Sequence, residues 1–498
     1  MNRRRFLKYA GASAAVVGAS AIGLEYLVGP RMGNVNQTAT TGTTSSLDRT
    51  PPTIKDFQWQ PTRVVNGKVN DATISFSVED QESAVVDVSA TLRDYAPTIP
   101  PRAYATEPSR SLQLTPPQTQ ARTSVYSAQV NGLKGGKEYR VMVTARDSAG
   151  NQADVQFETP YIREFENISG KDDFLVGAVY LPWWENPCGP NSYCHWDVSR
   201  ADYVRGTTPL GTPLLGLYNS NDPMVIAKQF DWATGYGIDF LLCEFYKQSS
   251  ASRRFTPLFE HPMISDIKIA FSYVTNILGG PTEDIELVDL NDPATYSTLE
   301  SDFEYMAKNF FSHPSYLRIG DRPVVQIYFT FALRSEISTP IARLRKRMAE
   351  LGYDIYLIGD EASARFDPDL KRIKAFDAIS FCNDILPPTY EPMAIEEVRK
   401  VYSIWQSAAH RVGVELIPWA YPGYDDTHLK DRPQSYGYVP RNTEFLSYTL
   451  KNALQFADRN GMVGIYSFND WGEGTFVEPS VEDGFKYLQT LENTLAGS

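Results

Sequence analysis

The feature that most constrains this chain is a series of apolar runs that alternate with amphipathic segments from Asp173 onward. Continuous runs of Val, Ile, Leu and Phe are typical of parallel strands buried on both faces, with helices returning the chain between them. The runs are Phe174–Tyr180, Ile238–Glu244, Ile267–Tyr273, Pro323–Phe329, Ile355–Asp360, Ala375–Cys382, Val414–Trp419 and Val463–Phe468. Eight such units predict an α/β fold, a (β/α)8 TIM barrel, over residues 165–498.

Helical periodicity marks the segments between the runs. The expected helices are Pro223–Tyr236, Leu299–Phe311, Ile337–Leu351, Ile395–Arg411 and Asn442–Asn460. Each apolar run ends in polar or aromatic groups, namely Tyr180, Glu244, Tyr273, Tyr328, Asp360–Glu361, Asn383–Asp384, Trp419–Tyr421 and Asn469–Asp470. Because barrel enzymes build their sites at the carboxyl ends of the strands, this pattern predicts an active site there. For any single position, a surface polar group is the simpler interpretation.

The first residues indicate export. Arg4-Arg5 and the following Phe6-Leu7-Lys8 precede a weakly apolar, Ala- and Gly-rich run, so residues 1–30 resemble a twin-arginine signal or anchor. This route carries folded proteins across a prokaryotic membrane, and the predicted location is therefore extracellular or at the cell surface. An uncleaved signal that tethers the protein to the membrane stays open as an alternative.

A separate β domain is expected before the barrel. Residues 31–52 are rich in Thr, Ser and Gly and predict a flexible linker. Residues 53–162 contain short alternating strands such as Ala72–Val78 and Val85–Leu92. A Leu, a Gly turn and then Tyr139 at the start of a strand resemble the tyrosine corner of immunoglobulin-like and fibronectin III-like sandwiches. Such a module is more often a spacer or dock than a sugar-binding site.

The charge and the spacing of His and Cys residues argue against several classes of binding partner. The net charge of −13 argues against nucleic acid and anionic lipid, which select basic surfaces. The five His and four Cys show no metal-ligand spacing, so neither a metal nor a cofactor is expected, and a monomer is predicted. Cys188 and Cys194 form either a disulfide or two free thiols, whereas Cys243 and Cys382 are expected to be buried.

The candidate catalytic pair is Asp470 and Glu473, directly after the eighth run. Glycosidic cleavage uses two carboxyl groups, one as general acid and the other as nucleophile or base. Gly472 and Gly474 allow the tight backbone that such a turn needs. Glu478 is a third acid, interpreted as structural because Pro479 follows. Spacing alone is a weak signal, since acidic residues are common at helix N-termini.

The barrel region resembles the endo-α-mannosidases and their relatives among the glycoside hydrolases over most of residues 174–480. Five motifs carry the resemblance: Tyr180–Pro187 with Tyr193–Trp196; Leu214–Asp222 with Asp231-Trp232 and Gly237–Asp239; His313–Arg318 with Arg322–Val324; Pro422–Thr427; and Ser467–Pro479. The resemblance implies metal-independent cleavage with retention, in which Glu473 is the general acid/base. It also implies that Asp470 deprotonates the sugar 2-hydroxyl, which then attacks the anomeric carbon.

The residues expected to bind substrate are Tyr180, Trp183, His195, Trp196, Tyr218, Glu244, Tyr273, Tyr328, Trp419, Tyr421, Asn469 and Trp471. The sequence departs from the family pattern at three positions. Asp470 stands where the family has Glu, Pro190 where it has an acidic residue, and His428 where it has Arg. Asp is shorter by one methylene, about 1.5 Å. The resemblance therefore implies the fold, and the identity of the substrate is not carried over with it.

Three functions follow from these observations. The first is an exported, endo-acting hydrolase of α-linked, mannose-type oligosaccharides or polysaccharides. The second is a glycan-binding surface protein with an altered or inactive barrel, motivated by Asp470. The third is a role in surface-polysaccharide biosynthesis, against which the export signal argues because activated sugar donors are cytoplasmic.

Overall fold

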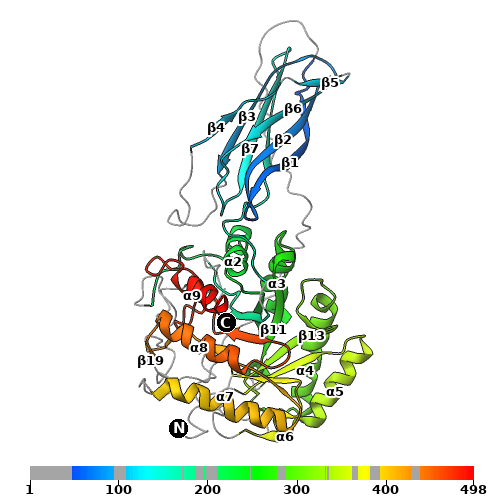
Figure 1. Ribbon diagram of the computed structural model, residues 1–498. Helices are drawn as coiled ribbons and strands as arrows, with labels where there is room; N and C mark the ends of the chain where they lie inside the picture. The colour runs from blue at the N-terminus through cyan, green and yellow to red at the C-terminus, as the bar shows by residue number, and fades with distance from the viewer. Residues whose placement is uncertain are drawn as a thin grey trace. The chain divides into compact units, whose positions relative to one another are not determined.

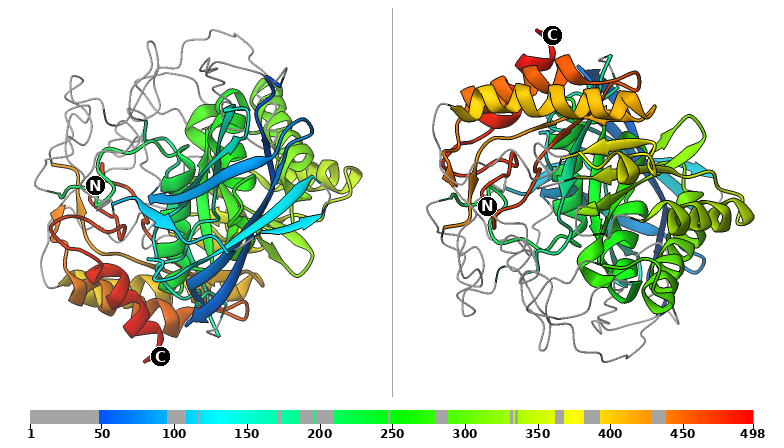
Figure 2. Two further views of the ribbon diagram at one scale, coloured as in Figure 1. Left: turned by 90° about the horizontal axis from the view of Figure 1, so that it is seen from above. Right: turned by 90° about the horizontal axis from the view of Figure 1, so that it is seen from below.

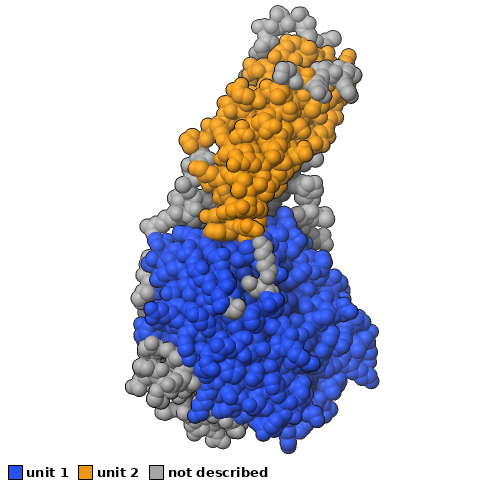
Figure 3. All heavy atoms as spheres, viewed as in Figure 1, with its two compact units in different colours: residues 1–18, 167–498 blue, residues 19–166 orange. Residues whose placement is uncertain are grey.

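The computed structural model has two compact units: a first one that ends at Glu166, drawn in orange as unit 2 in Figure 3, and a second one that begins at Asn167, drawn in blue as unit 1. The predicted signal and linker up to residue 47 lie outside the described residues, as do His195, Cys188, Cys194, Cys382, Asn383, Asp384, Pro190 and His428. The described residues are 48–94, 108–115, 117–120, 122–170, 173–185, 196, 210–246, 248–278, 288–330, 333, 336–361, 368–381, 393–427 and 438–497.

The first unit consists of two antiparallel sheets. One has the order β1 (Thr53–Val65), β2 (Lys68–Glu79), β6 (Thr123–Val130), β5 (Gln118–Gln120); the other has the order β4 (Arg110–Leu112), β3 (Val85–Asp94), β7 (Tyr139–Asp147), β8 (Gln152–Glu158). Alternate residues of both sheets, such as Ile74 and Val141, share one buried core. The Tyr139 hydroxyl accepts a hydrogen bond from the Lys134 amide at 2.9 Å. The immunoglobulin/fibronectin III assignment stays a prediction.

The second unit is built on a nearly closed barrel of parallel strands (Figure 1). Its strands are β9 (Leu175–Tyr180), β10 (Phe240–Phe245), β11 (Lys268–Val274), β13 (Arg322–Tyr328), β14 (Tyr356–Asp360), β15 (Ala378–Ser380), β16 (Glu415–Ile417), β17 (Trp419–Ala420) and β20 (Met462–Ile465). Pro418 divides β16, which pairs with β15, from β17, which pairs with β20. Counting these two as one strand gives eight, and the predicted parallel barrel is confirmed.

A helix follows each strand of the barrel, and the helices lie around the strands (Figure 2). They are α2 (Pro223–Gly235), α3 (Gln248–Phe259), α4 (Pro293–Met306), α5 (Ser338–Glu350), α6 (Leu370–Ile373), α7 (Met393–Arg411), α8 (Thr443–Phe456) and α9 (Lys486–Leu495). Helix α4 begins six residues before its predicted start because the Asp292 side chain caps it, accepting from the Thr295 amide. A π-helical turn, Ala307–Phe311, extends it to the predicted end.

Shorter elements complete the second unit. They are the 3-10 turns Ile264–Asp266 and Thr275–Leu278, and the two-residue strands β12 (Arg318–Ile319), β18 (Tyr424–Asp425) and β19 (Tyr438–Val439). Strand β12 pairs with β13, and β18 pairs with β19, both antiparallel. Among the described residues, no helix is long and apolar enough to cross a bilayer.

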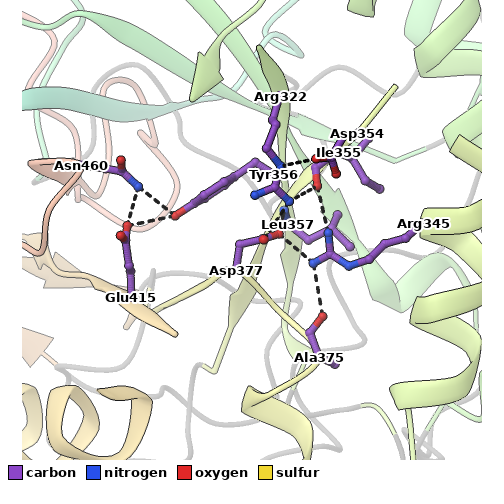
Figure 4. A network of polar contacts seen from close by, with 10 residues as sticks. All are labelled: Arg322, Arg345, Asp354, Ile355, Tyr356, Leu357, Ala375, Asp377, Glu415 and Asn460. Carbon is purple, nitrogen blue, oxygen red and sulfur yellow. Dashed lines mark hydrogen bonds and ion pairs between the residues drawn. The ribbon is translucent and has the colours of Figure 1, made fainter. Parts of the chain in front are cut away.

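An ionic network holds together the amino ends of the barrel strands (Figure 4). The Asp377 carboxylate pairs with both Arg322 and Arg345, each at 2.7 Å. Both arginines also donate to the Ile355 carbonyl, so β13, α5 and the start of β14 are joined to the segment before β15. This end of a barrel contributes stability, and catalytic groups belong to the opposite end.

Candidate active site

The side chains at the carboxyl ends of the strands divide between the barrel interior and the helix layer. Successive residues of a strand point to opposite faces. Glu244 shares its face of β10 with Phe240 and Leu242, whereas Phe245 on the other face packs against Phe255 of helix α3. Asp360 shares its face of β14 with Tyr356 and Ile358, and its carboxylate accepts from the Ser380 hydroxyl of β15 at 3.2 Å. Both acids therefore lie at the carboxyl end of the barrel interior.

The loop after β20 brings the predicted catalytic pair to the same end. The Asp470 amide donates to the Ser467 hydroxyl at 2.7 Å, and the Glu473 amide donates to Asp470 Oδ1 at 2.9 Å. The next residue, Gly474, has a φ of +65°, which a side chain rarely adopts. Both carboxyl residues are buried, at 9% and 8% exposure. The loop thus fixes the two acids relative to one another.

A tyrosine that sequence reasoning missed joins the acids. The buried Tyr466 hydroxyl donates to Glu473 Oε2 at 3.2 Å. Burial raises the pKa of Tyr466 well above its ordinary value, and the negative charges of Glu473, Asp470 and Glu244 raise it further, as does Tyr328. Glu473 contacts this hydroxyl directly, and the other three groups act on it through their charges. No sequence signal singles out Tyr466, since it lies within the apolar run Val463–Phe468, where an aromatic residue is usually core.

Glu244 is the most strongly perturbed acid of this group. Burial raises its pKa to about 7, and the charges of Glu473 and Asp360 raise it, whereas a hydrogen bond from Tyr246 and the charge of Arg254 lower it. The Tyr246 hydroxyl lies 2.8 Å from Glu244 Oε2. A carboxyl group with such a pKa exchanges its proton near neutral pH, as a general acid or base must.

An aromatic surface adjoins Glu244. The half-buried Trp183 ring lies 5.5 Å from the ring of Tyr246, with a tilt of 55°. The neighbouring Glu185 carboxylate pairs with Arg253 at 2.7 Å. The structure therefore brings together five of the predicted site residues, and adds Tyr246, Tyr466 and Asp360. Those five are Trp183, Glu244, Tyr328, Asp470 and Glu473.

Two predicted sugar-binding tyrosines face the helices instead. The Tyr180 hydroxyl donates to Gln229 of α2 at 2.6 Å, and the Tyr273 hydroxyl donates to Asp302 of α4 at 2.9 Å. Both rings are fully buried. Each residue ends or nearly ends its strand, as predicted, but the pleat turns its side chain outward. Their placement supports a structural role and corrects the expectation that they contact substrate.

A second set of predicted residues converges on Glu478. This buried carboxylate accepts from the Tyr218 hydroxyl at 2.8 Å, from Gln229 Nε2 at 2.7 Å and from Trp471 Nε1 at 2.9 Å. Burial raises the pKa of Glu478 to about 7, although the three donors act in the opposite direction. This geometry agrees with the interpretation of Glu478 as structural. Tyr218 and Trp471, which were expected to bind substrate, belong to the same buried framework.

The remaining predicted residues support the framework as well. Asn469 bonds both main-chain polar groups of Leu181, accepting at 2.8 Å and donating at 3.1 Å. Trp196 is buried, and its indole donates to the Tyr218 carbonyl at 2.7 Å. Trp419 and Tyr421 are buried as well. The contacts of Trp196, Trp419 and Tyr421 with sugar stay a prediction.

Comparisons with known proteins agree with a carbohydrate-related barrel. The family model "Glycosyltransferase WbsX" matches residues 294–491. The uncharacterised protein WxcX of Xanthomonas campestris pv. campestris is 25% identical over 355 residues, covering 64% of this chain and 49% of that protein. The chain thus spans about half the length of this relative.

Two further comparisons concern the barrel. A glycoprotein endo-alpha-1,2-mannosidase of Mus musculus is 22% identical over 337 residues, covering 62% of this chain and 68% of that protein. A solved structure described as a glycoside hydrolase-like protein aligns with a TM-score of 0.51 at 20% identity, covering 68% of this chain and 97% of the other. The structural match supports the fold, and the sequence similarity relates the barrel to glycoside hydrolase and glycosyltransferase sequences.

Proposed function

We propose that this chain is an exported glycoside hydrolase that cleaves α-linked, mannose-type glycans internally, with retention of configuration and without a metal. Glu473 is the general acid/base and Asp470 is its partner carboxylate. The observation that carries the proposal is the convergence of Glu473, Asp470, Glu244 and Tyr466 at the carboxyl end of the barrel. Three acids at this end of the barrel provide both a proton donor and a proton acceptor within one site.

The reaction places each proton on a named group. Glu473 protonates the leaving glycosidic oxygen while Asp470 removes the proton from the sugar 2-hydroxyl, and the resulting oxyanion attacks the anomeric carbon. Water then attacks the anomeric carbon of this 1,2-anhydro intermediate and gives one proton to Glu473. Asp470 returns the proton that it took to the sugar 2-oxygen as the bond between this oxygen and the anomeric carbon breaks. The Tyr466 hydrogen bond to Oε2 of Glu473 holds this side chain in place during both steps.

The structure favours a smaller set of sugar contacts than the sequence predicts. Trp183 and Tyr246 present aromatic rings beside Glu244, and ring faces are suited to the apolar faces of sugars. The Tyr328 side chain is half-buried at the end of β13, and Tyr328, like Glu473, interacts electrostatically with Tyr466. We assign substrate contact to these three residues and to Glu244.

Glycosyl transfer in surface-polysaccharide assembly is the second candidate. The match of residues 294–491 to a family described as a glycosyltransferase favours it. The predicted export signal in residues 1–30 opposes it, because nucleotide-activated sugars are found in the cytoplasm. Asp470, where the resembling family has Glu, also leaves a binding protein without turnover as an outcome that must be tested.

The test is a substrate panel for the purified chain. α-Mannan and α-linked manno- and gluco-oligosaccharides are incubated with the protein, and the anomer of the first product is read by proton NMR. We expect oligosaccharide release from a mannose-type substrate with the α-anomer formed first. Sugar incorporation into an acceptor only when a nucleotide sugar is supplied would identify a transferase. Calorimetric binding of mannan without released sugar would identify a binding protein.

A further inference from the structure

Three aspartates that sequence analysis did not single out meet in the first unit. They are Asp48 before β1, Asp80 directly after β2, and Asp147 at the end of β7. One carboxylate oxygen of each lies within 4.8 Å of one from each of the others. The Ser148 amide donates to the Ala84 carbonyl at 2.8 Å, so the β2–β3 and β7–β8 turns are joined beside the cluster.

Buried carboxylate oxygens in the cluster lack donors. Asp80 is only 6% exposed, and its Oδ1 accepts from the Glu82 and Ser83 amides at 2.8 and 2.7 Å. Its Oδ2 is buried and has no hydrogen-bond partner among the described residues, and the same holds for Asp48 Oδ2. A buried anionic oxygen without a donor or a cation is strongly disfavoured, so these two oxygens call for a positively charged partner.

The protein itself does not supply that charge in the part of the chain that the structure describes, where neither Lys nor Arg forms a salt bridge with Asp48, Asp80 or Asp147. Glu82 adds a fourth acid near Asp48, and its carboxyl group is exposed. Asn151 orients the site by donating to Asp147 Oδ2 at 2.8 Å and, through its amide, to Oδ1 at 2.8 Å.

The donor set identifies the class of cation. All the available ligands are oxygens, which hard cations prefer, and neither His nor Cys belongs to the cluster. Ca²⁺ accepts six to eight oxygens in a flexible arrangement, and carboxylates together with turn carbonyls suit it. Mg²⁺ requires near-octahedral geometry and retains most of its water, so it fits a site of three carboxylates from separate segments less well.

We propose that Asp48, Asp80 and Asp147 bind one calcium ion, which fastens the segment before β1 to the β2–β3 and β7–β8 turns. This site is independent of the glycan chemistry proposed for the barrel. Because Asp48 lies within the predicted linker, residues 31–52, bound calcium fixes the last part of that linker to the first unit. Arg49, exposed beside Asp48, provides a trypsin site whose cleavage reports on that fixation.

Calorimetric titration of the full chain with CaCl2, after removal of metals with EGTA, tests the proposal. We expect one site with a dissociation constant of about 1 mM or lower, the range of extracellular calcium modules. We also expect a higher melting temperature, and slower trypsin cleavage at Arg49, in calcium than in EGTA. An equal response to MgCl2 at the same concentration, or no calcium uptake, would overturn the assignment.

Substitutions locate the site. Asp80→Asn keeps the shape of the side chain and Oδ1 for the two turn amides, and it should weaken calcium binding at least about tenfold. Asp48→Asn, which lies outside every strand, should do the same without endangering the fold. Asp87→Asn removes an exposed carboxylate of β3 and should leave the affinity unchanged. Wild-type affinity in both Asp80→Asn and Asp48→Asn would refute the proposal.

Discussion

The Glu473 backbone amide donates a hydrogen bond to the Asp470 carboxylate at 2.9 Å. Asp470, which stands where the similar family has the longer Glu, is therefore part of the turn that carries Glu473, the proposed general acid. Ser467 in turn positions Asp470, because the Ser467 hydroxyl accepts a hydrogen bond from the Asp470 amide. Geometry and chemistry thus depend on the same side chain, and substitutions must separate them.

Asp470→Asn separates the two roles. Asn keeps an acceptor oxygen for the Glu473 amide but cannot take a proton, so turnover should fall by about 10²–10⁴ while the free energy of unfolding stays unchanged. Asp470→Ala should lose the same activity and also about 1 kcal/mol of stability, from the missing hydrogen bond. Steady-state kinetics and urea unfolding of both variants provide the check. Full turnover in Asp470→Asn would show that Asp470 only holds the loop.

The pKa of Glu244 should depend on the charge of Glu473. Burial is the main cause of its pKa of about 7, and Glu473 adds to it by repulsion. Removing that negative charge in Glu473→Gln favours ionised Glu244, so the pKa of Glu244 should fall towards its ordinary value. Carboxyl carbon NMR titration measures this shift. The exposed Glu444→Gln should leave the Glu244 titration unchanged, and an unchanged titration in Glu473→Gln would place the two acids too far apart.

Glu478 should make the barrel less stable as the pH rises. Its folded pKa of about 7 exceeds the ordinary 4.5, so the folded state holds the proton more tightly than the unfolded chain. The associated stability is complete below pH 4.5 and is lost as the pH rises through 7, amounting to about 3 kcal/mol. Glu478→Gln should reduce the difference in unfolding free energy between pH 5 and pH 8. An unaltered difference would contradict the assignment.

Removing one partner of the Arg372–Glu361 ion pair should destabilise the barrel more than removing both partners. It is fully buried, and the two side chains share a 2.6 Å contact. Arg372→Met leaves an unpaired buried charge and should cost about 3–5 kcal/mol, and the double variant Glu361→Leu/Arg372→Met should recover most of that loss. Arg347→Met removes an exposed pair and should cost about 1 kcal/mol or less. Urea unfolding of the four proteins tests this, and equal losses in both single variants would contradict it.

The sequence predicts the barrel well because each strand is a continuous apolar run. Every predicted run overlaps a strand of the barrel ring, including the run that Pro418 interrupts, and the ends differ by a few residues. Helix α3 was not predicted, since polar residues and Pro257 obscure its period. The short α6 was also missed, because four residues carry too little periodicity.

The site is less predictable because a strand end does not specify which way its last side chain points. Tyr180 and Glu244 both end apolar runs, but the first faces α2 and the second faces the barrel interior. Which residues of a strand face the barrel interior could be determined only from their partners on neighbouring strands. Tyr466 was missed for the related reason that it lies inside an apolar run, where an aromatic residue is usually core.

The most direct test of the proposed function is the turnover of Glu473→Gln on the best substrate of the α-glycan panel. Gln preserves the shape and the contact with Tyr466 but cannot donate the proton, so the rate should fall by about 10²–10⁴ while the glycan is still bound. The matched Glu444→Gln should retain wild-type turnover. Full activity in Glu473→Gln would contradict the assignment of Glu473 as the general acid/base.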